Sequence, residues 1–421
     1  MVQLINDSNG KLKWSRISWM VGLFIIMPPF IGLSCLFFYM WKDKVRCKTD
    51  YFVFMLCVAI YLGAINATKI PGGDQMQYHM AYLNVPTQGF IGSLTYIYGY
   101  NAVEGNATGI SGEFMNGVYN YIGYYLTFGH YSIFAALLTI VDYMLIFFGL
   151  YNVFRTMKSP HKPIVCGVIT IAFFYLFFQY TLQIQKQFLA QSIMMYVLAS
   201  YAEKGKMSLK LWVMAMCAVF THASTGLFLP FLILKPLRRR LTKKWLLFIG
   251  FMLFLFILYG PRMAEKVAGE DSGVAGYGVK RFAESEGQDD LASNLVMSQV
   301  LVIAVPMFII VFRQLWLKRN LMIDKAQAFI LNITLLLLLA VASMYTKPLA
   351  QIRYFMMLLA FMPFVYPFIS SRIKTRNFWL MSIAIVMVVW FYAQFEFIVW
   401  DYAPEWQIIA YPPLALIAIG A

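Results

Sequence analysis

The sequence predicts an all-α polytopic membrane protein, and three observations support this fold class. Of its 421 residues, 61% are hydrophobic and only 13% are charged, which is too apolar for a soluble globular chain. The mean hydropathy is +0.67. The apolar residues form about a dozen runs of helical length that are separated by polar segments. We therefore predict one integral membrane domain over residues 1–421, with about 12 transmembrane helices, some of them short or re-entrant.

The first apolar run is long enough to span a bilayer and has no small-residue cleavage site, so we expect a retained helix and not a signal peptide. The later runs are bounded by charged or turn-forming residues. In chain order the predicted spans are 19–40, 51–65, 131–154, 163–182, 187–202, 209–220, 224–234, 245–260, 293–312, 326–345, 354–370 and 378–399.

The distribution of basic residues predicts the orientation of these spans. The net charge of +15 would suggest a nucleic-acid partner in a soluble protein, but 23 of the 34 Lys and Arg residues lie in six short loops. These loops should be cytoplasmic, and we expect no nucleic-acid partner. The loops are 41–50, 155–162, 203–210, 235–244, 313–325 and 371–377. Two longer segments, about 66–130 and 261–292, should then face the exterior.

The loops 203–210 and 235–244 should both be cytoplasmic, so the chain between them must cross the membrane an even number of times. Two short helices with His222 at their outer tip satisfy this condition. Each is too short for a full bilayer, which predicts that the pair is re-entrant or lies where the membrane is thinned. His222 is then either a functional histidine or a turn residue whose ring is satisfied locally.

A polar stripe is predicted near the middle of the chain. Gln183, Gln187 and Gln191 recur every four residues, and Lys186 lies one position aside. One helix would gather these side chains on a face turned away from lipid, where they would line a wet cavity. The alternative for Lys186 is a lysine whose ammonium group reaches the membrane interface.

The first outer segment carries the sequence GGDQMQYHMAY and is rich in tyrosine. Tyrosines such as Tyr78 suit sugar rings, although an aromatic belt at the membrane interface explains them equally well. Asp74 follows two glycines and is either a functional acid or a solvated loop residue. Lys347, Arg353 and Tyr354 flank the start of a late span, where Arg353 could also serve as an interfacial anchor.

Lys186, His222, Arg353 and Asp74 together offer two cations, a base and an acid for one cavity at membrane level. Such a set suits chemistry with an anionic leaving group. The five cysteines show no CxxC spacing, and no nucleotide-binding glycine motif is evident. We expect neither a cofactor nor a metal.

Four segments resemble, in this order, signatures of the EpsG-like branch of the Wzy oligosaccharide repeat-unit polymerases. They are GGDQMQY, QKQFLAQSIMMYVLASYAEKGK, FTHASTGLFLP and QIRYF, and the resemblance covers roughly residues 50–370. Members of this family usually carry arginine where this chain has Lys186. Lysine keeps the positive charge but lacks the bidentate geometry of a guanidinium group.

The resemblance implies a multi-pass polymerase of the bacterial inner membrane that makes a surface polysaccharide such as O-antigen, part of lipopolysaccharide, or capsule. It would transfer the growing glycan from undecaprenyl diphosphate onto a lipid-linked repeat unit at the outer face, with membrane lipid around it and a chain-length regulator protein as a candidate partner. We predict His222 or Asp74 as the base. The predicted substrate-binding residues are Lys186, Arg353, Gln187, Gln183, Tyr78 and Tyr354.

Two other functions are compatible with the sequence. A flippase for lipid-linked oligosaccharides would also need a cationic cavity, and Asp142, midway along the span 131–154, could couple transport to protons. A glycosyltransferase that uses a polyprenyl-monophosphate sugar would have an acidic residue resembling Asp74 in its first outer loop.

Overall fold

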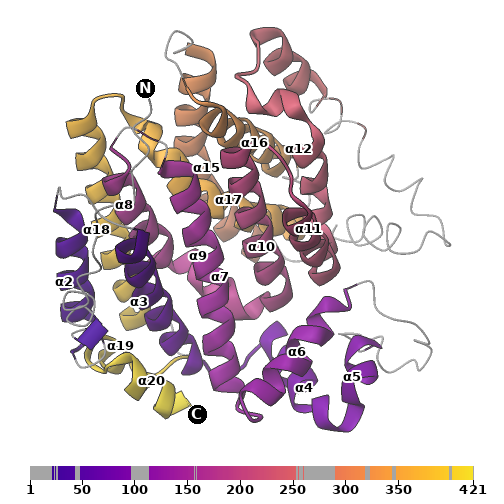
Figure 1. Cartoon of the computed structure of the whole chain (residues 1–421), viewed down its shortest axis with the longest axis vertical. Coiled ribbons are helices and arrows are strands. Elements are labelled where there is room, and N and C mark those ends of the chain that lie inside the picture. Colours follow the sequence, from indigo (N-terminus) through magenta and orange to yellow (C-terminus); the bar gives the residue numbers. More distant parts are fainter. Residues whose placement is uncertain are drawn as a thin grey trace. The chain divides into compact units, whose positions relative to one another are not determined.

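The computed structural model describes residues 21–42, 48–95, 113–155, 157–252, 255, 259, 290–317, 323–343, 348–397 and 401–420, with short gaps at 23, 25, 26 and 158. Over these residues the chain is helical and contains no strand (Figure 1). The predicted all-α fold class is therefore confirmed. The chain forms two compact units. The first comprises residues 1–192 and 381–421, and the second comprises residues 193–380.

The first unit contains the helices at both ends of the described chain. They are α2 (Pro29–Trp41), α3 (Lys48–Ala67), α4 (Asp74–Leu83), α5 (Val85–Thr95), α6 (Met115–Leu126), α7 (Tyr131–Phe154), α8 (His161–Ala172), α9 (Tyr175–Gln183), the start of α10 (Gln185–Lys204), most of α18 (Ile373–Phe397), α19 (Glu405–Ala410) and α20 (Pro413–Gly420).

The core of the first unit is the close pair α3 and α7, which lie side by side in Figure 1. Gly63 permits the close approach, because a Cβ atom there would lie 2.7 Å from the carbonyl oxygen of Ala136. The side-chain amide of Asn66 donates to Thr139 Oγ1 at 2.9 Å and fixes the register. From the other side, the Tyr61 hydroxyl donates to the carbonyl oxygen of Ile408, so that α19 is tied to α3.

The second unit is built around α16 (Lys325–Ser343) and α17 (Pro348–Val365). Its other elements are the later part of α10, α11 (Leu209–Thr221), η3 (Ala223–Phe228), α12 (Leu229–Ile233), η4 (Lys235–Arg238), α15 (Asp290–Phe312), the π-helical turn η5 (Arg313–Leu317) and η6 (Tyr366–Ile369).

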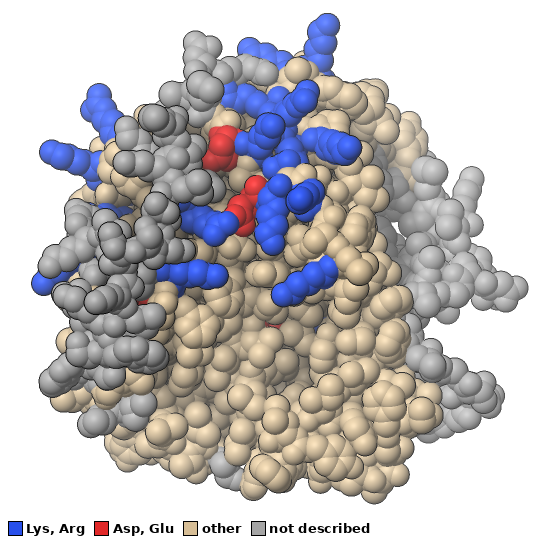
Figure 2. Space-filling view, in the orientation of Figure 1, with Lys and Arg blue, Asp and Glu red and all other residues tan. Residues whose placement is uncertain are grey.

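The basic loop 235–244 is held in the second unit by hydrogen bonds between side chains and backbone carbonyl oxygens. Asn332, which is fully buried in α16, donates to the carbonyl oxygens of Leu237 and Arg239 at 2.8 Å each. Arg238 donates to the carbonyl oxygen of Ala202 near the end of α10. On the face drawn in Figure 2, Lys and Arg side chains outnumber Asp and Glu, as expected for a net charge of +15.

Four described helices are long and apolar enough to cross a membrane: Lys48–Ala67, Tyr131–Phe154, Lys325–Ser343 and Ile373–Phe395. A fifth candidate is the pair α8 and α9, if its two arms form one span. Several shorter apolar helices accompany them, including α11 and the stretch Ala223–Ile233. The protein is therefore a helical membrane protein, and the number of about 12 spans stays a prediction.

Several predicted boundaries differ from the structure. The predicted span 163–182 is not one continuous helix, because the chain bends by 57° between α8 and α9. Phe174 is extended at the bend, and its neighbour Phe173 packs its ring on Phe391 of α18. The first outer segment is also more ordered than a loop, since it contains α4, α5 and α6. Residues 261–289 of the second predicted outer segment lie outside the described residues.

Candidate functional site

A break in the helix precedes Lys186. Helix α9 ends at Gln183, Ile184 leaves helical geometry with φ −115° and ψ 45°, and α10 begins at Gln185. The prediction of one continuous glutamine stripe is therefore wrong, because Gln183 belongs to the preceding helix. Gln187 does lie on α10 and is buried inside the protein. The break places Lys186 in the first turn of α10, at the end of an apolar stretch.

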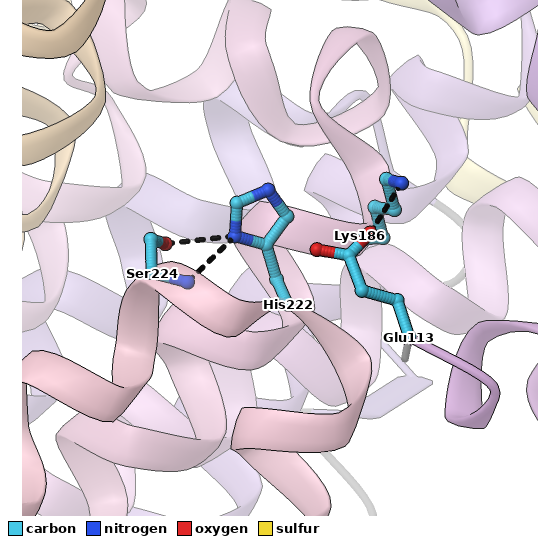
Figure 3. A network of polar contacts seen from close by, with 4 residues as sticks. All are labelled: Glu113, Lys186, His222 and Ser224. Atoms are coloured by element: carbon cyan, nitrogen blue, oxygen red, sulfur yellow. Dashed lines mark hydrogen bonds and ion pairs between the residues drawn. The ribbon is translucent and has the colours of Figure 1, made fainter. Parts of the chain in front are cut away.

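Lys186 forms an ion pair with Glu113, with 2.5 Å between Lys186 Nζ and Glu113 Oε2 (Figure 3). Glu113 lies just before α6 and is 73 residues away in the sequence. The side chains of Lys186 and Glu113 are 19% and 24% exposed, respectively. The side chain of Lys186 is therefore partly exposed. Its carboxylate partner, Glu113, is not predicted by any sequence pattern.

Polar and aromatic contacts extend from α10 to α7 and α4. The Tyr131 hydroxyl at the start of α7 donates to Gln185 Oε1 at 3.4 Å. The centre of the Tyr131 ring lies 4.4 Å from the centre of the imidazole ring of His79 on α4. Partial burial lowers the pKa of His79 below its ordinary value, which favours the neutral imidazole. His79, Tyr131 and Gln185 therefore connect α4 to the residue next to Lys186.

His79 lies inside the segment GGDQMQYHMAY, and no functional role is predicted for it from the sequence. The signal that could have found it is a titratable residue in a segment otherwise rich in apolar and aromatic side chains. Glu113 gave no such signal, because a single acid in a polar outer segment is ordinary.

Asp74 is the first residue of α4 and is exposed. Gly73 precedes it with a φ of +54°, a conformation that glycine adopts without strain. An acid in the first turn of a helix is favourable whatever its chemical role, because the backbone dipole is positive there. Tyr78 lies one turn further along α4 and is buried. The predicted acid and tyrosine therefore share the helix that also carries His79.

In the second unit, His222 lies where α11 ends and η3 begins, in an extended conformation. Its Nδ1 lies 2.7 Å from Ser224 Oγ, and the backbone N–H of Ser224 donates to Nδ1 at 3.3 Å (Figure 3). Because a backbone N–H can only donate, Nδ1 is an acceptor, and a neutral His222 ring carries its proton on Nε2. The geometry therefore presents Nε2 as a hydrogen-bond donor.

Arg353 lies on α17 by its backbone, while its side chain and Lys347 fall outside the described residues. Tyr354, the next residue of α17, is partly buried. Lys186 and Asp74 belong to the first unit, and His222 and Arg353 belong to the second. That these four residues share one cavity stays a prediction. Among the described residues, no group of three or more His, Cys, Asp or Glu is placed to hold a metal ion.

The fold and the buried polar residues define a helical membrane protein with titratable groups at the ends of its apolar helices. Comparison with protein-family models identifies the family within this class. The chain belongs to the EpsG family, whose model matches residues 52–411. Membership suggests a membrane glycosyltransferase or polymerase of polysaccharide synthesis. Comparisons with curated proteins and with solved structures found no match.

Proposed function

We propose that this protein polymerises a surface polysaccharide by transferring the growing glycan from undecaprenyl diphosphate onto a lipid-linked repeat unit. In this proposal it is a multi-pass protein of the bacterial inner membrane, and its active site faces outward. The observation that carries the proposal is the match to the EpsG family over residues 52–411, which includes every predicted site residue. The accessible Lys186 supports it, because a diphosphate leaving group needs a cation.

The ion pair between Lys186 and Glu113 is compatible with this role. A partly exposed ion pair contributes on the order of 1 kcal/mol or less to stability. A diphosphate carries more negative charge than one carboxylate, so it can displace Glu113 from Lys186. In our proposal Glu113 neutralises Lys186 between reaction cycles, and Arg353 supplies the second positive charge.

The acceptor hydroxyl must lose a proton as it attacks the sugar of the donor. We assign this step to His222 or Asp74. The hydrogen bonds of Ser224 to Nδ1 leave the proton of a neutral His222 on Nε2, which suits donation to a diphosphate oxygen better than proton abstraction. Asp74 is exposed, so an acceptor hydroxyl can reach it, and the neutral His79 lies on the same helix.

The experiment that tests the function uses purified protein and lipid-linked repeat units. Chain extension should give products with several repeat units, and Lys186→Ala or Arg353→Ala should give none at equal expression. In cells that lack the native gene, the surface lipid should carry a single repeat unit. Purified protein that leaves the repeat units unextended under conditions where it remains folded would contradict the proposal.

A lipid-linked oligosaccharide flippase is the second candidate, and one observation favours it. Asp142 lies in the middle of α7 and is fully buried, as an intramembrane acid of a proton-coupled transporter could be. Loss of a flippase would leave no repeat unit on the surface lipid. Loss of a polyprenyl-phosphate-sugar transferase would instead shorten the repeat unit itself, so one gel distinguishes all three functions.

A further inference from the structure

A short segment that follows α18 lies against the residues that follow α3. The backbone N–H of Ile70 donates to the carbonyl oxygen of Asp401 at 2.7 Å. In return, the backbone N–H of Ala403 donates to Thr68 Oγ1 at 3.2 Å. Two parts of the chain that are more than 300 residues apart are thus joined by hydrogen bonds in both directions. All these residues belong to the first unit.

Tyr402 is the buried centre of this contact. Its hydroxyl donates to Asn66 Oδ1 at 3.4 Å, and Asn66 in turn donates to Thr139 of α7. The face of its ring lies 5.4 Å from the ammonium group of Lys69. A cation above an aromatic face is attracted to it, and the attraction increases when both groups are removed from water. Tyr402 therefore contacts the chain on both sides of Thr68.

Lys69 is buried, with 8% of its surface exposed, and its ammonium group donates to the carbonyl oxygen of Gln179 at 3.2 Å. Burying an ammonium group is unfavourable unless it has partners. The carbonyl oxygen, the Tyr402 ring and the nearby charge of Asp401 supply such partners. The segment Asp401–Ala403 therefore adds contacts to residues 68–70 beyond those that they make with the end of α3 and with Gln179.

Residues 68–73 are the only covalent link between α3 and the helix that begins at Asp74. The last part of this link consists of Gly72 and Gly73, both exposed, which have more conformational freedom than other residues. A Cβ atom added at either glycine would meet no neighbouring atom within 4 Å, so no side chain packs against them there. Their carbonyl oxygens accept from the backbone N–H groups of Gln75 and Met76, which joins both glycines to the start of α4. Within this link, residues 68–70 are therefore the part that contacts a distant segment of the chain.

We propose that the segment Asp401–Ala403 is a positioning element for the Gly-Gly-Asp loop, residues 72–74, and that Tyr402 is its central positioning residue. The effect on activity rests on the proposed function, in which Asp74 acts on the acceptor. The effect on the loop does not, because it follows from the contacts of Tyr402 with Asn66 and Lys69.

Hydrogen exchange of the purified full chain tests the proposal. Tyr402→Leu and Thr68→Val should each increase amide exchange severalfold in peptides covering residues 66–77, while exchange in α7 stays unchanged. Tyr402→Phe keeps the ring beneath Lys69 and should increase exchange less. Trp406→Leu is the control, since Trp406 is 56% exposed and its described ring contact is with Tyr411.

Activity measurements separate this inference from the proposed function. Tyr402→Leu should lower kcat for chain extension more than it raises KM, and Tyr402→Phe should restore most of kcat. Unchanged exchange over residues 66–77 in both Tyr402→Leu and Thr68→Val would overturn the inference, as would exchange increased equally in every peptide. Increased exchange together with a fully active Asp74→Asn variant would support the positioning element and contradict the role of Asp74 in the proposed function.

Discussion

Lys186 and Glu113 form an ion pair between the first turn of α10 and the residues before α6. From this ion pair we predict how a substitution of Glu113 changes the KM for the donor substrate. In Glu113→Gln the carboxylate no longer competes for Lys186, so the KM for the lipid diphosphate should fall severalfold. Lys186→Ala should abolish polysaccharide ladders, and Lys186→Arg should retain activity because arginine keeps the charge.

Steady-state chain extension measures the KM, and gels of cells lacking the native gene show the ladders. Lys204→Ala is a matched control, because this lysine lies at the opposite end of α10. Full-length ladders from Lys186→Ala at equal expression would show that this cation does not bind the diphosphate.

The contact between Ser224 and Nδ1 of His222 predicts which substitutions of this histidine are tolerated. If His222 donates a hydrogen bond from Nε2, the side-chain amide of glutamine can supply a donor at a similar distance. His222→Gln should then retain measurable chain extension. The kcat/KM of His222→Ala should be at least about tenfold lower than that of His222→Gln, since one hydrogen bond to a charged group contributes roughly 1.5–3 kcal/mol.

The comparison uses kcat/KM of the two purified variants at the same pH. Equal and complete loss in both would favour His222 as a proton acceptor. Normal turnover in His222→Ala would instead move the catalytic role to Asp74.

The burial of Lys69 leads us to predict that the stability of the protein depends on pH. It lies beyond the end of the candidate span α3, and burial lowers its pKa from 10.5 to about 8, partly opposed by the charge of Asp401. Between these two pH values the unfolded chain holds a proton that the folded chain has released. The free energy of unfolding should therefore rise with pH across this window, by an amount on the order of 3 kcal/mol.

Thermal unfolding in detergent at pH 7, 9 and 10.5 measures this effect. Lys69→Met should remove this part of the pH dependence, whereas Lys204→Met should leave it unchanged. An identical pH profile for Lys69→Met and the unmodified protein would show that Lys69 titrates normally.

The sequence predicts the boundaries of the long apolar helices well. The predicted span 131–154 coincides with α7, and the prediction of a helix from residue 209 to 220 differs from α11 by one residue. Apolar runs bounded by charged residues determine such helices. The bend after Ala172 and the break at Ile184 were not predictable in this way, because neither contains glycine or proline. At the bend, Phe173 packs on Phe391 of α18, a contact that local sequence does not indicate.

In the candidate site, too, some features follow from local sequence and others from contacts between distant segments. Charged or titratable residues beside apolar runs are unusual, so the sequence itself indicates Lys186, His222 and Asp74. The sequence does not indicate the partner of Lys186, because Glu113 lies 73 residues away along the chain. The contact of Tyr402 with Lys69 spans an even longer separation. Sequence periodicity carries no information about such pairs, which become visible only when the helices are placed in three dimensions.

The last prediction is that chain extension needs no divalent metal. A metal-dependent glycosyl transfer holds its ion with two or more oxygen ligands, usually carboxylates at fixed spacing. In our proposal Lys186 and Arg353 provide the positive charge that would otherwise come from the ion, since fixed cations can stabilise a departing diphosphate in the same way.

The measurement is chain extension by detergent-purified protein with excess EDTA. Activity should equal that of the untreated protein, and added magnesium or manganese should not increase it. Lys186→Ala should remain inactive when either metal is added, because an ion without ligands cannot replace a positioned cation. Loss of activity in EDTA with recovery on adding magnesium would contradict the prediction. It would make Asp74 and the acids of residues 284–290 the first candidates for metal ligands, because two or more carboxylates would then have to meet at the diphosphate.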